Sequence, residues 1–315
     1  MTQVSSVKQL LRSFWQWFDT SDSRGAADAD AMRIDWVRVV PFIGLHVTAI
    51  VGVCLVGASW IAVGVAVLLY ALRMFAITGF YHRYFSHKTF RTSRPMQFLM
   101  ALLGASSVQR GPLWWAAHHR NHHRHSDTEH DVHSPVTKGF WFAHMGWFLT
   151  RAGFRTDWSV IPDWKKFWEL KLIDRFDVFI AIGLAWILFW LGGFLQTHYP
   201  ELGTSRSQML IWGFFVSTVV LFHCTVTINS LAHQFGKRRY RTRDHSRNNL
   251  WLALITFGEG WHNNHHHFPG SARQGFYWWE VDITYYGLKM LSWLGLVWDL
   301  KPVPAELRLA GRVQS

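Results

Sequence analysis

The sequence predicts an all-α integral membrane protein with four transmembrane helices and a cytoplasmic helical cap. Half of its 315 residues are hydrophobic, and residues 39–72 contain no Asp, Glu, Lys or Arg. Because a span needs about 20 apolar residues, this stretch accommodates two short spans. Residues 178–195 and 209–228 supply a third and a fourth. The alternative, a soluble core of buried helices, is disfavoured by charge-free stretches of this length.

The distribution of basic residues predicts the topology. The formal net charge is +12, but nothing resembles the basic face of a nucleic-acid-binding fold, so no nucleic-acid partner is expected. Lys and Arg gather before Val39, between His82 and Arg175, and from Lys237 onward, whereas the other two connections carry almost none. Since cytoplasmic loops are enriched in Lys and Arg, we expect both termini and the middle segment in the cytoplasm, as in a multi-pass protein of a bacterial inner membrane.

These boundaries divide the chain into five expected parts. They are residues 1–36, a cytoplasmic N-terminal segment with an interfacial helix; residues 37–81, spans 1 and 2; residues 82–176, the cytoplasmic cap; residues 177–233, spans 3 and 4; and residues 234–315, a cytoplasmic C-terminal part. The interfacial helix is expected over residues 8–18, and residues 281–298 are apolar enough to lie on the membrane surface. Arg73, near the end of span 2, is expected to snorkel towards the interface.

Two cysteines, Cys54 and Cys224, both lie in apolar stretches. They favour neither a disulfide framework nor a cysteine metal site. No apolar segment precedes Val39, so a cleavable signal peptide is not expected.

The histidines are grouped in short motifs. The candidate ligands are His82 and His87 in HRYFSH, His119, His122 and His123 in HRNHH, His233 in NSLAH, and His262, His265 and His266 in WHNNHHH. On a helix, positions i, i+3 and i+4 share one face, so each H-x2-H-H motif directs three imidazoles into one volume. Imidazole suits iron, copper, zinc and nickel, and nine imidazoles exceed the needs of one tetrahedral zinc ion. The set therefore predicts two metal ions.

The topology brings these motifs together. HRYFSH follows span 2, NSLAH closes span 4, and the two H-x2-H-H motifs lie in cytoplasmic segments, so all four can meet at one membrane face. Each motif alone has a plainer explanation as surface histidine, a solvated polar loop or, for His233, a histidine at the membrane boundary. Nearby carboxylates are candidates for orienting the ligands through N–H hydrogen bonds: Asp127, Glu129, Asp131 and Glu259. His46 and His223, inside the spans, are expected to pack with a hydrogen bond.

The chain resembles the membrane-bound fatty acyl desaturases, in particular the delta-9 branch that includes stearoyl-CoA desaturase. The resemblance covers about residues 40–300 and rests on HRYFSH, HRNHH followed by RHSDTEHDVHSP, KGFWFAHMGW, NSLAH and GEGWHNNHHHFP. It implies a cap that holds a non-haem di-iron centre, with O2 as co-substrate. It also implies a cis double bond, delta-9 in this branch, placed in a saturated acyl chain carried by CoA or by a lipid. Two electrons would come from an external donor of the ferredoxin or cytochrome b5 type with its reductase.

The resemblance also implies how the ligands divide. One iron would be held by His82, His87, His123 and His266, with Asn229 reaching it through a water, and the other by His119, His122, His233, His262 and His265. No catalytic residue beyond these ligands is expected. Tyr70 and Met74, one turn apart on span 2, are predicted to close the far end of the substrate tunnel, although helix packing explains them equally well.

One departure leaves the acyl carrier open between CoA, a membrane lipid and acyl carrier protein. Animal acyl-CoA enzymes carry Arg-Asp before the first histidine of the second motif, where this chain has Ala117 and His118. A fatty acyl hydroxylase on the same scaffold is an alternative function. A membrane metal transporter would place its ligands inside the spans, and a membrane cytochrome would leave the H-x2-H-H motifs unexplained.

Overall fold

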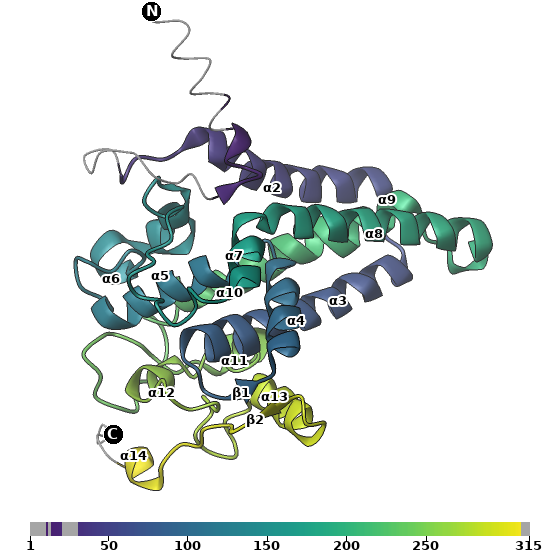
Figure 1. Cartoon of the computed structure of the whole chain (residues 1–315). Helices are drawn as coiled ribbons and strands as arrows, with labels where there is room; N and C mark the ends of the chain where they lie inside the picture. The colour runs from purple at the N-terminus through teal and green to yellow at the C-terminus, as the bar shows by residue number, and fades with distance from the viewer. Residues whose placement is uncertain (1–10, 12–13, 21–30, 310–315) are drawn as a thin grey trace, which may run out of the picture.

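A computed structural model describes residue 11, residues 14–20 and residues 31–309, and these residues are almost entirely helical (Figure 1). The elements in chain order are α2 (Trp36–Val56), α3 (Trp60–Phe75), η3 (Ala76–Ser86), β1 (Arg91–Thr92), α4 (Arg94–Ala105), α5 (Pro112–His125), α6 (Pro135–Lys138), η4 (Phe142–Gly146), η5 (Trp147–Leu149), α7 (Trp168–Arg175), α8 (Asp177–His198), η6 (Pro200–Leu202), α9 (Arg206–Leu210), η7 (Ile211–Val216), α10 (Ser217–Ser230), α11 (Leu250–Ile255), α12 (His262–His267), α13 (Ile283–Trp293), β2 (Val297–Trp298) and α14 (Ala305–Leu309).

Four continuous helical stretches are long and apolar enough to cross a membrane, which confirms the predicted fold class. They are Val39–Val56, Trp60–Ser86, Asp177–His198 and Arg206–Ser230. In Figure 1 α2, α3 and α8 extend in one direction, while α5, α6 and α12 lie at the opposite end of the molecule. The histidine motifs therefore gather beyond one end of the apolar helices.

The second and fourth apolar stretches each change helix type along their length. The second is an α-helix to Phe75 and continues as the π-helix η3, whereas the fourth contains the π-helical segment η7 between α9 and α10. A π-helix pairs residue i with i+5, so it redirects side chains relative to an α-helix. His82 thus belongs to the helix that continues span 2 rather than to a separate segment.

A buried apolar cluster lies under the histidine-bearing elements. Its fully buried members include Phe85 of η3, Met100 of α4, Leu113 of α5 and Leu170 of α7. The two-stranded antiparallel sheet fastens the C-terminal part to this cluster by pairing Arg91 with Trp298 and Thr92 with Val297. The cluster fixes the position of η3 relative to α5, so that the histidines on the two helices are held in one place.

The snorkelling predicted for Arg73 is wrong. Its side chain is 1% exposed, and its Nη1 donates to Thr218 Oγ1 at 2.8 Å and to the carbonyl of Ser106 at 3.3 Å. Nearby hydroxyls from η7–α10 satisfy the guanidinium inside the protein, so it has no need of the interface.

The two predicted interfacial segments are described to different extents. Residues 8–10 and 12–13 of the N-terminal helix lie outside the described residues, while the described Leu11, Phe14 and Trp15 are exposed. In the C-terminal segment α13 leaves Trp293 76% exposed, as an element in contact with a membrane surface would.

Candidate metal centre

The first histidine motif depends on the π-helix. In η3 the backbone N–H of His87 donates to the carbonyl of His82 at 3.3 Å, which is the i→i+5 bond of a π-helix. In an α-helix residues five apart point to different sides, because only i+3 and i+4 neighbours share a face. The π-helical turn therefore brings both imidazoles of H-x4-H to one side of the helix, and their ring centroids lie 4.9 Å apart.

The second motif lies on α5, whose N-terminus is held by a carboxylate from α7. Asp174 Oδ1 accepts hydrogen bonds from the backbone N–H groups of Leu113 and Trp114, both at 2.9 Å. Gly111 permits this approach, because a Cβ at that position would lie 2.3 Å from Asp174 Oδ1 and 2.4 Å from the Asp174 Cα. Burial raises the pKa of Asp174 to about 7. The start of α5 is thus fixed two turns before its first ligand.

Farther along α5, Arg120 fastens the helix to η3. Its guanidinium donates to the carbonyls of Phe85 and Ser86, each at 2.9 Å, and forms an ion pair with Asp163 at 2.7 Å. This side chain is largely buried. Arg120 therefore holds two ligand-bearing helices together rather than presenting a charge to a partner.

The third motif forms the short helix α12, which two buried asparagines hold in place. Asn263 Oδ1 accepts from the backbone N–H groups of Arg239 and Tyr240 at 2.8 and 2.7 Å. Asn264 donates to Glu280 at 2.8 Å and accepts from Asn248 Nδ2 at 2.7 Å. A six-residue helix is too short to be stable alone, so these bonds set its position. Sequence reasoning missed both asparagines, although they lie between the histidines of WHNNHHH.

The structure brings all nine predicted histidines together in two groups. Within each group the ligand nitrogens lie within 4.8 Å of one another: His82, His87, His119, His123 and His265 in the first group, and His122, His233, His262 and His266 in the second. All nine imidazoles are buried or half-buried. The nitrogens converge closely enough for each group to hold one metal ion.

This grouping differs from the division between the two irons implied by the resemblance. His119 and His265 belong with the HRYFSH histidines, and His266 belongs with His233. In each H-x2-H-H motif the first and last histidines, four residues apart, join one group, while the middle one crosses to the other. On an α-helix the side chain at i+4 is rotated by about 40° from that at i, whereas the side chain at i+3 is rotated by about 60° in the opposite direction. Residues i and i+4 can therefore reach one site while residue i+3 reaches a second site beside it.

Four carboxylates orient the ligand histidines, each accepting the Nδ1–H of one imidazole. Asp131 bonds His122 at 3.0 Å, Asp127 bonds His233 at 2.8 Å, Asp244 bonds His266 at 2.7 Å and Glu259 bonds His82 at 2.5 Å. A carboxylate on Nδ1 fixes the tautomer and leaves the Nε2 lone pair for a metal. The expectation is confirmed for Asp127, Asp131 and Glu259. Glu129 is exposed, and Asp244 was missed because it precedes its histidine by 22 residues.

The pKa shifts around the two groups favour the protonation states that bind a metal. Burial, followed by the neighbouring imidazoles, lowers the pKa of His119, His123, His262 and His265 well below its usual value, so these rings are neutral at pH 7. For Asp127 burial acts upward, but the hydrogen bond and charge of His233 outweigh it and hold its pKa below the usual range. Neutral imidazoles backed by ionised carboxylates are what a histidine-ligated divalent metal requires.

An unsatisfied nitrogen supports the fit to a metal ion. Among the described residues His266 Nε2 is buried with no hydrogen-bond partner, although its Nδ1 is bonded to Asp244. Leaving a buried polar atom unpaired costs about 1–3 kcal/mol, so such an atom calls for an explanation. It lies in the second group, where a metal ion would take its lone pair. The nitrogen-only donor set suits iron as well as copper, zinc or nickel.

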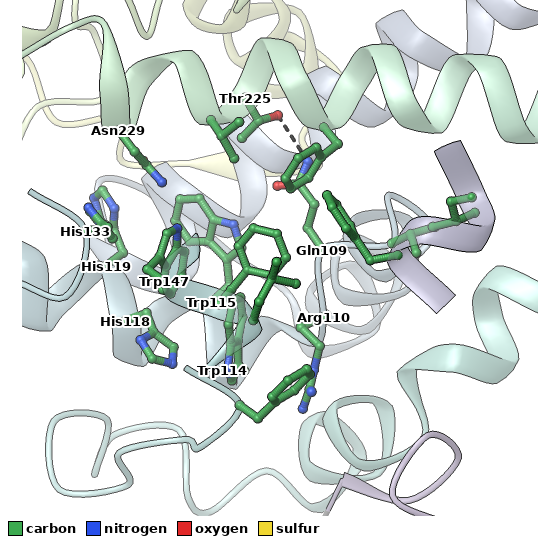
Figure 2. A pocket seen from close by; sticks show the side chains of 18 of the residues that line it. Gln109, Arg110, Trp114, Trp115, His118, His119, His133, Trp147, Thr225 and Asn229 are labelled. Carbon is green, nitrogen blue, oxygen red and sulfur yellow. Dashed lines mark hydrogen bonds between the residues drawn. The ribbon is translucent and has the colours of Figure 1, made fainter. Parts of the chain in front are cut away.

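A mainly apolar cavity of about 230 Å³ adjoins the first group, and we call it the histidine-side cavity. Figure 2 shows His119, His133 and Asn229 together in its wall, with Arg110 away from them. Gln109 donates to Thr225 Oγ1 across the cavity at 3.1 Å (Figure 2). The predicted water-mediated ligand Asn229 thus faces the same space as His119.

The two predicted tunnel residues do not line this cavity. Met74 is fully buried, and the hydroxyl of Tyr70 donates to the carbonyl of Ile255 on α11. Their role at the end of a tunnel stays a prediction.

The two histidines inside the spans form a chain of their own. His46 Nε2 lies 3.0 Å from His223 Nε2, and His223 Nδ1 lies 3.1 Å from His144 Nε2. The hydrogen bond between His46 and His223 confirms the sequence-based expectation. His144 ends the chain at Ser230, 2.9 Å away, so KGFWFAHMGW packs against span 4 at the residue directly after Asn229 and three before His233.

Comparison with known proteins agrees with this geometry. The fatty acid desaturase family model matches residues 58–290. The chain is 38% identical over 274 residues to an sn-1 stearoyl-lipid 9-desaturase of Anabaena variabilis, which covers 85% of this chain and 94% of the relative. It is 36% identical over 316 residues to the sn-1 stearoyl-lipid 9-desaturase of Synechocystis, in a match that covers 98% of this chain and 93% of the relative. An acyl-CoA 5-desaturase of Anemone leveillei is 35% identical over 286 residues, in a match that covers 87% of this chain and 84% of the relative. With its four apolar helices and its histidine centre, the chain belongs to the fatty acid desaturase family and is a multi-pass membrane oxidoreductase that acts on fatty acyl chains.

Proposed function

We propose that this protein inserts a cis double bond, at the delta-9 position, into a saturated acyl chain at a centre of two iron ions. The observation that carries the proposal is the histidine-side cavity, because an apolar space with His119 and Asn229 in its wall is what an alkyl chain beside a metal needs. The first iron would be held by the first group of histidines, with Asn229 through a water, and the second iron by the second group. The overall change takes two hydrogens from the chain while O2, two electrons and two protons become two waters.

The protein's own residues bind and position the chain. Trp114, Trp115 and Trp147 supply apolar walls to the histidine-side cavity, which exclude water from the methylenes. The bond between Gln109 and Thr225 narrows the cavity from opposite sides. A flexible alkyl chain held between these walls presents a restricted set of carbons to the centre, and this selects the bond position.

The acyl carrier in this proposal is a membrane lipid. Both stearoyl-lipid relatives named above support it. So does Ala117, which stands where an animal acyl-CoA enzyme carries Arg and supplies no charge. Its neighbour His118 does not replace that cation: burial lowers the pKa of His118 to about 4, and its Nε2 bonds the carbonyl of Arg155 at 2.9 Å, so it is neutral and unavailable to a phosphate.

Topology and electron supply complete the proposal. The excess of Lys and Arg beside the histidine end of the spans supports a cytoplasmic centre and cytoplasmic termini, in a bacterial inner membrane. A separate ferredoxin or cytochrome b5 with its reductase would deliver the electrons. Lys237 and Arg124, which are exposed near the centre, supply positive charge for an acidic donor.

The test is the fatty-acid profile of a host that expresses the chain, measured by gas chromatography with mass spectrometry beside His262→Ala. A new cis monoene that needs His262 supports the proposal and locates the bond. A hydroxylated product assigns the protein to the hydroxylases instead. If neither product forms although the purified chain binds two irons and is reduced by a supplied donor, the proposed reaction is wrong.

A further inference from the structure

A second cavity adjoins the histidine-side cavity and is open towards the space between two spans. We call it the lateral cavity; its volume is about 480 Å³. Its walls come from the N-terminal halves of α2 and α8, through Val40, Gly44, Ala181 and Ile182, and from residues 16–20. Val40 and Ile182 are 54% and 48% exposed on helices apolar enough to span a membrane. In a bilayer this cavity would therefore face lipid.

The two cavities meet at a shared boundary. Four residues line both of them: Pro41, Val108, Arg110 and Phe154. Two of these have unusual backbone conformations, with φ of 60° at Val108 and 68° at Arg110. A positive φ is a true outlier for a β-branched residue, and such strain persists only where the surrounding structure enforces it. The α4–α5 connection is thus held in a costly conformation where the lateral cavity joins the space beside His119.

The polar groups around the lateral cavity suit an ester better than a multiply charged carrier. Arg110 is paired with Asp177 at 3.1 Å, and Arg175, close by, is paired with Asp19 at 2.6 Å, so neither cation is spare for a phosphate-rich group. Trp17 also lines the cavity, and its buried Nε1 has no hydrogen-bond partner among the described residues. A tryptophan N–H at a membrane interface is a suitable donor to an ester carbonyl.

We propose that the acyl chain reaches the histidine centre sideways from the bilayer, through the lateral cavity between α2 and α8, while it is still esterified to a membrane glycerolipid. This inference rests on the proposed function. The ester stays level with Trp17 and Arg110, and the chain passes the shared boundary into the histidine-side cavity. The lipid never leaves the membrane, so the site needs no aqueous binding surface for a carrier.

Photocrosslinking tests the route without relying on metal or turnover. The full chain is placed in nanodiscs that contain phosphatidylcholine with a diazirine in the middle of its sn-1 chain, and adducts are located by peptide mass spectrometry. Adducts on residues 40–45, 108–110 and 177–182 are expected, with palmitoyl-CoA bearing the same diazirine giving few. Adducts from the CoA ester at these positions, or from the lipid only on other lipid-facing surfaces, would overturn the proposal.

Two matched glycine variants provide a second measure. Gly44 in α2 and Gly64 in α3 are both exposed, and a Cβ at either would meet no heavy atom within 4 Å, but only Gly44 lines the lateral cavity. Gly44→Phe should reduce lipid crosslinking on residues 108–110 about tenfold, whereas Gly64→Phe should change it by less than about twofold. Equal crosslinking in the two variants refutes lateral access. The desaturation assay of the unaltered chain tests the reaction separately, so the two failures are distinguishable.

Discussion

Removing one orienting carboxylate should weaken the metal centre by a calculable amount. Asp127 accepts three hydrogen bonds, from His233 Nδ1 at 2.8 Å, from the backbone N–H of His245 at 2.7 Å and from the hydroxyl of Ser134 at 2.6 Å. Its side chain is 2% exposed, so water does not replace it easily. In Asp127→Ala the imidazole of His233 loses both its fixed tautomer and its orientation.

The magnitude follows from the bond that is lost. A hydrogen bond to a charged group contributes about 1.5–3 kcal/mol, and loss of such a partner typically costs about 10–100-fold in metal affinity. We expect the affinity of the second group for ferrous iron to fall by this factor. The first group should change less, because Asp127 contacts none of its histidines. Asp127→Asn keeps the size and one acceptor oxygen, so its affinity for the metal should lie between those of wild type and Asp127→Ala.

Metal retention against a graded chelator measures this directly. Iron bound per chain is determined after equilibration of the detergent-solubilised protein with increasing chelator. Glu129→Ala is the control, since Glu129 is a neighbouring carboxylate that is exposed. If Asp127→Ala keeps both irons as firmly as Glu129→Ala, the orienting role derived from the geometry is refuted.

Three further substitutions test other parts of the structure. Gly111→Ala forces a Cβ against the backbone of Asp174 and should destabilise the protein by about 1–3 kcal/mol, seen as a lower melting temperature; an unchanged melting temperature would contradict that packing. Burial raises the pKa of Asp174 from 3.8 to about 7, so its neutral form favours folding at low pH and this contribution is lost as the pH rises through 7. Asp174→Asn lacks this titration, so its melting temperature relative to wild type should increase between pH 6 and pH 8, and a constant difference would speak against it. Met74→Ala should shift the products towards longer chains, and unchanged product lengths would remove Met74 from the tunnel.

The histidines that gather at the centre could be predicted from the sequence, but their division into two groups could not. Helical spacing shows that three imidazoles of H-x2-H-H point roughly one way. It cannot show that two sites flank the helix and receive His122 and His123 separately. H-x4-H predicted a metal site less strongly than H-x2-H-H, because its two histidines share a face only on a π-helix. The local sequence does not indicate a π-helix.

Contacts between distant segments account for most of what was missed. Asp244 bonds His266 through the return of the chain after span 4, and Arg120 fastens α5 to η3, a contact that the sequence does not indicate. The hydroxyl partners of Arg73 lie more than 140 residues away in the sequence, so the local sequence around Arg73 gave no sign of them and indicated snorkelling instead. Each of these depends on tertiary packing, whereas the four apolar stretches were predicted correctly because span length is a local property.

The order of the ligands along the chain has a consequence for how the protein is made. The first ligand is residue 82 and the last is residue 266, so four of the nine are synthesised only after all four apolar helices. Membrane insertion must therefore precede completion of either metal site, and α12 must fold back before metal is captured. Because binding free energy is then also folding free energy, iron supply would determine how much newly inserted protein matures and how much is left open to proteolysis.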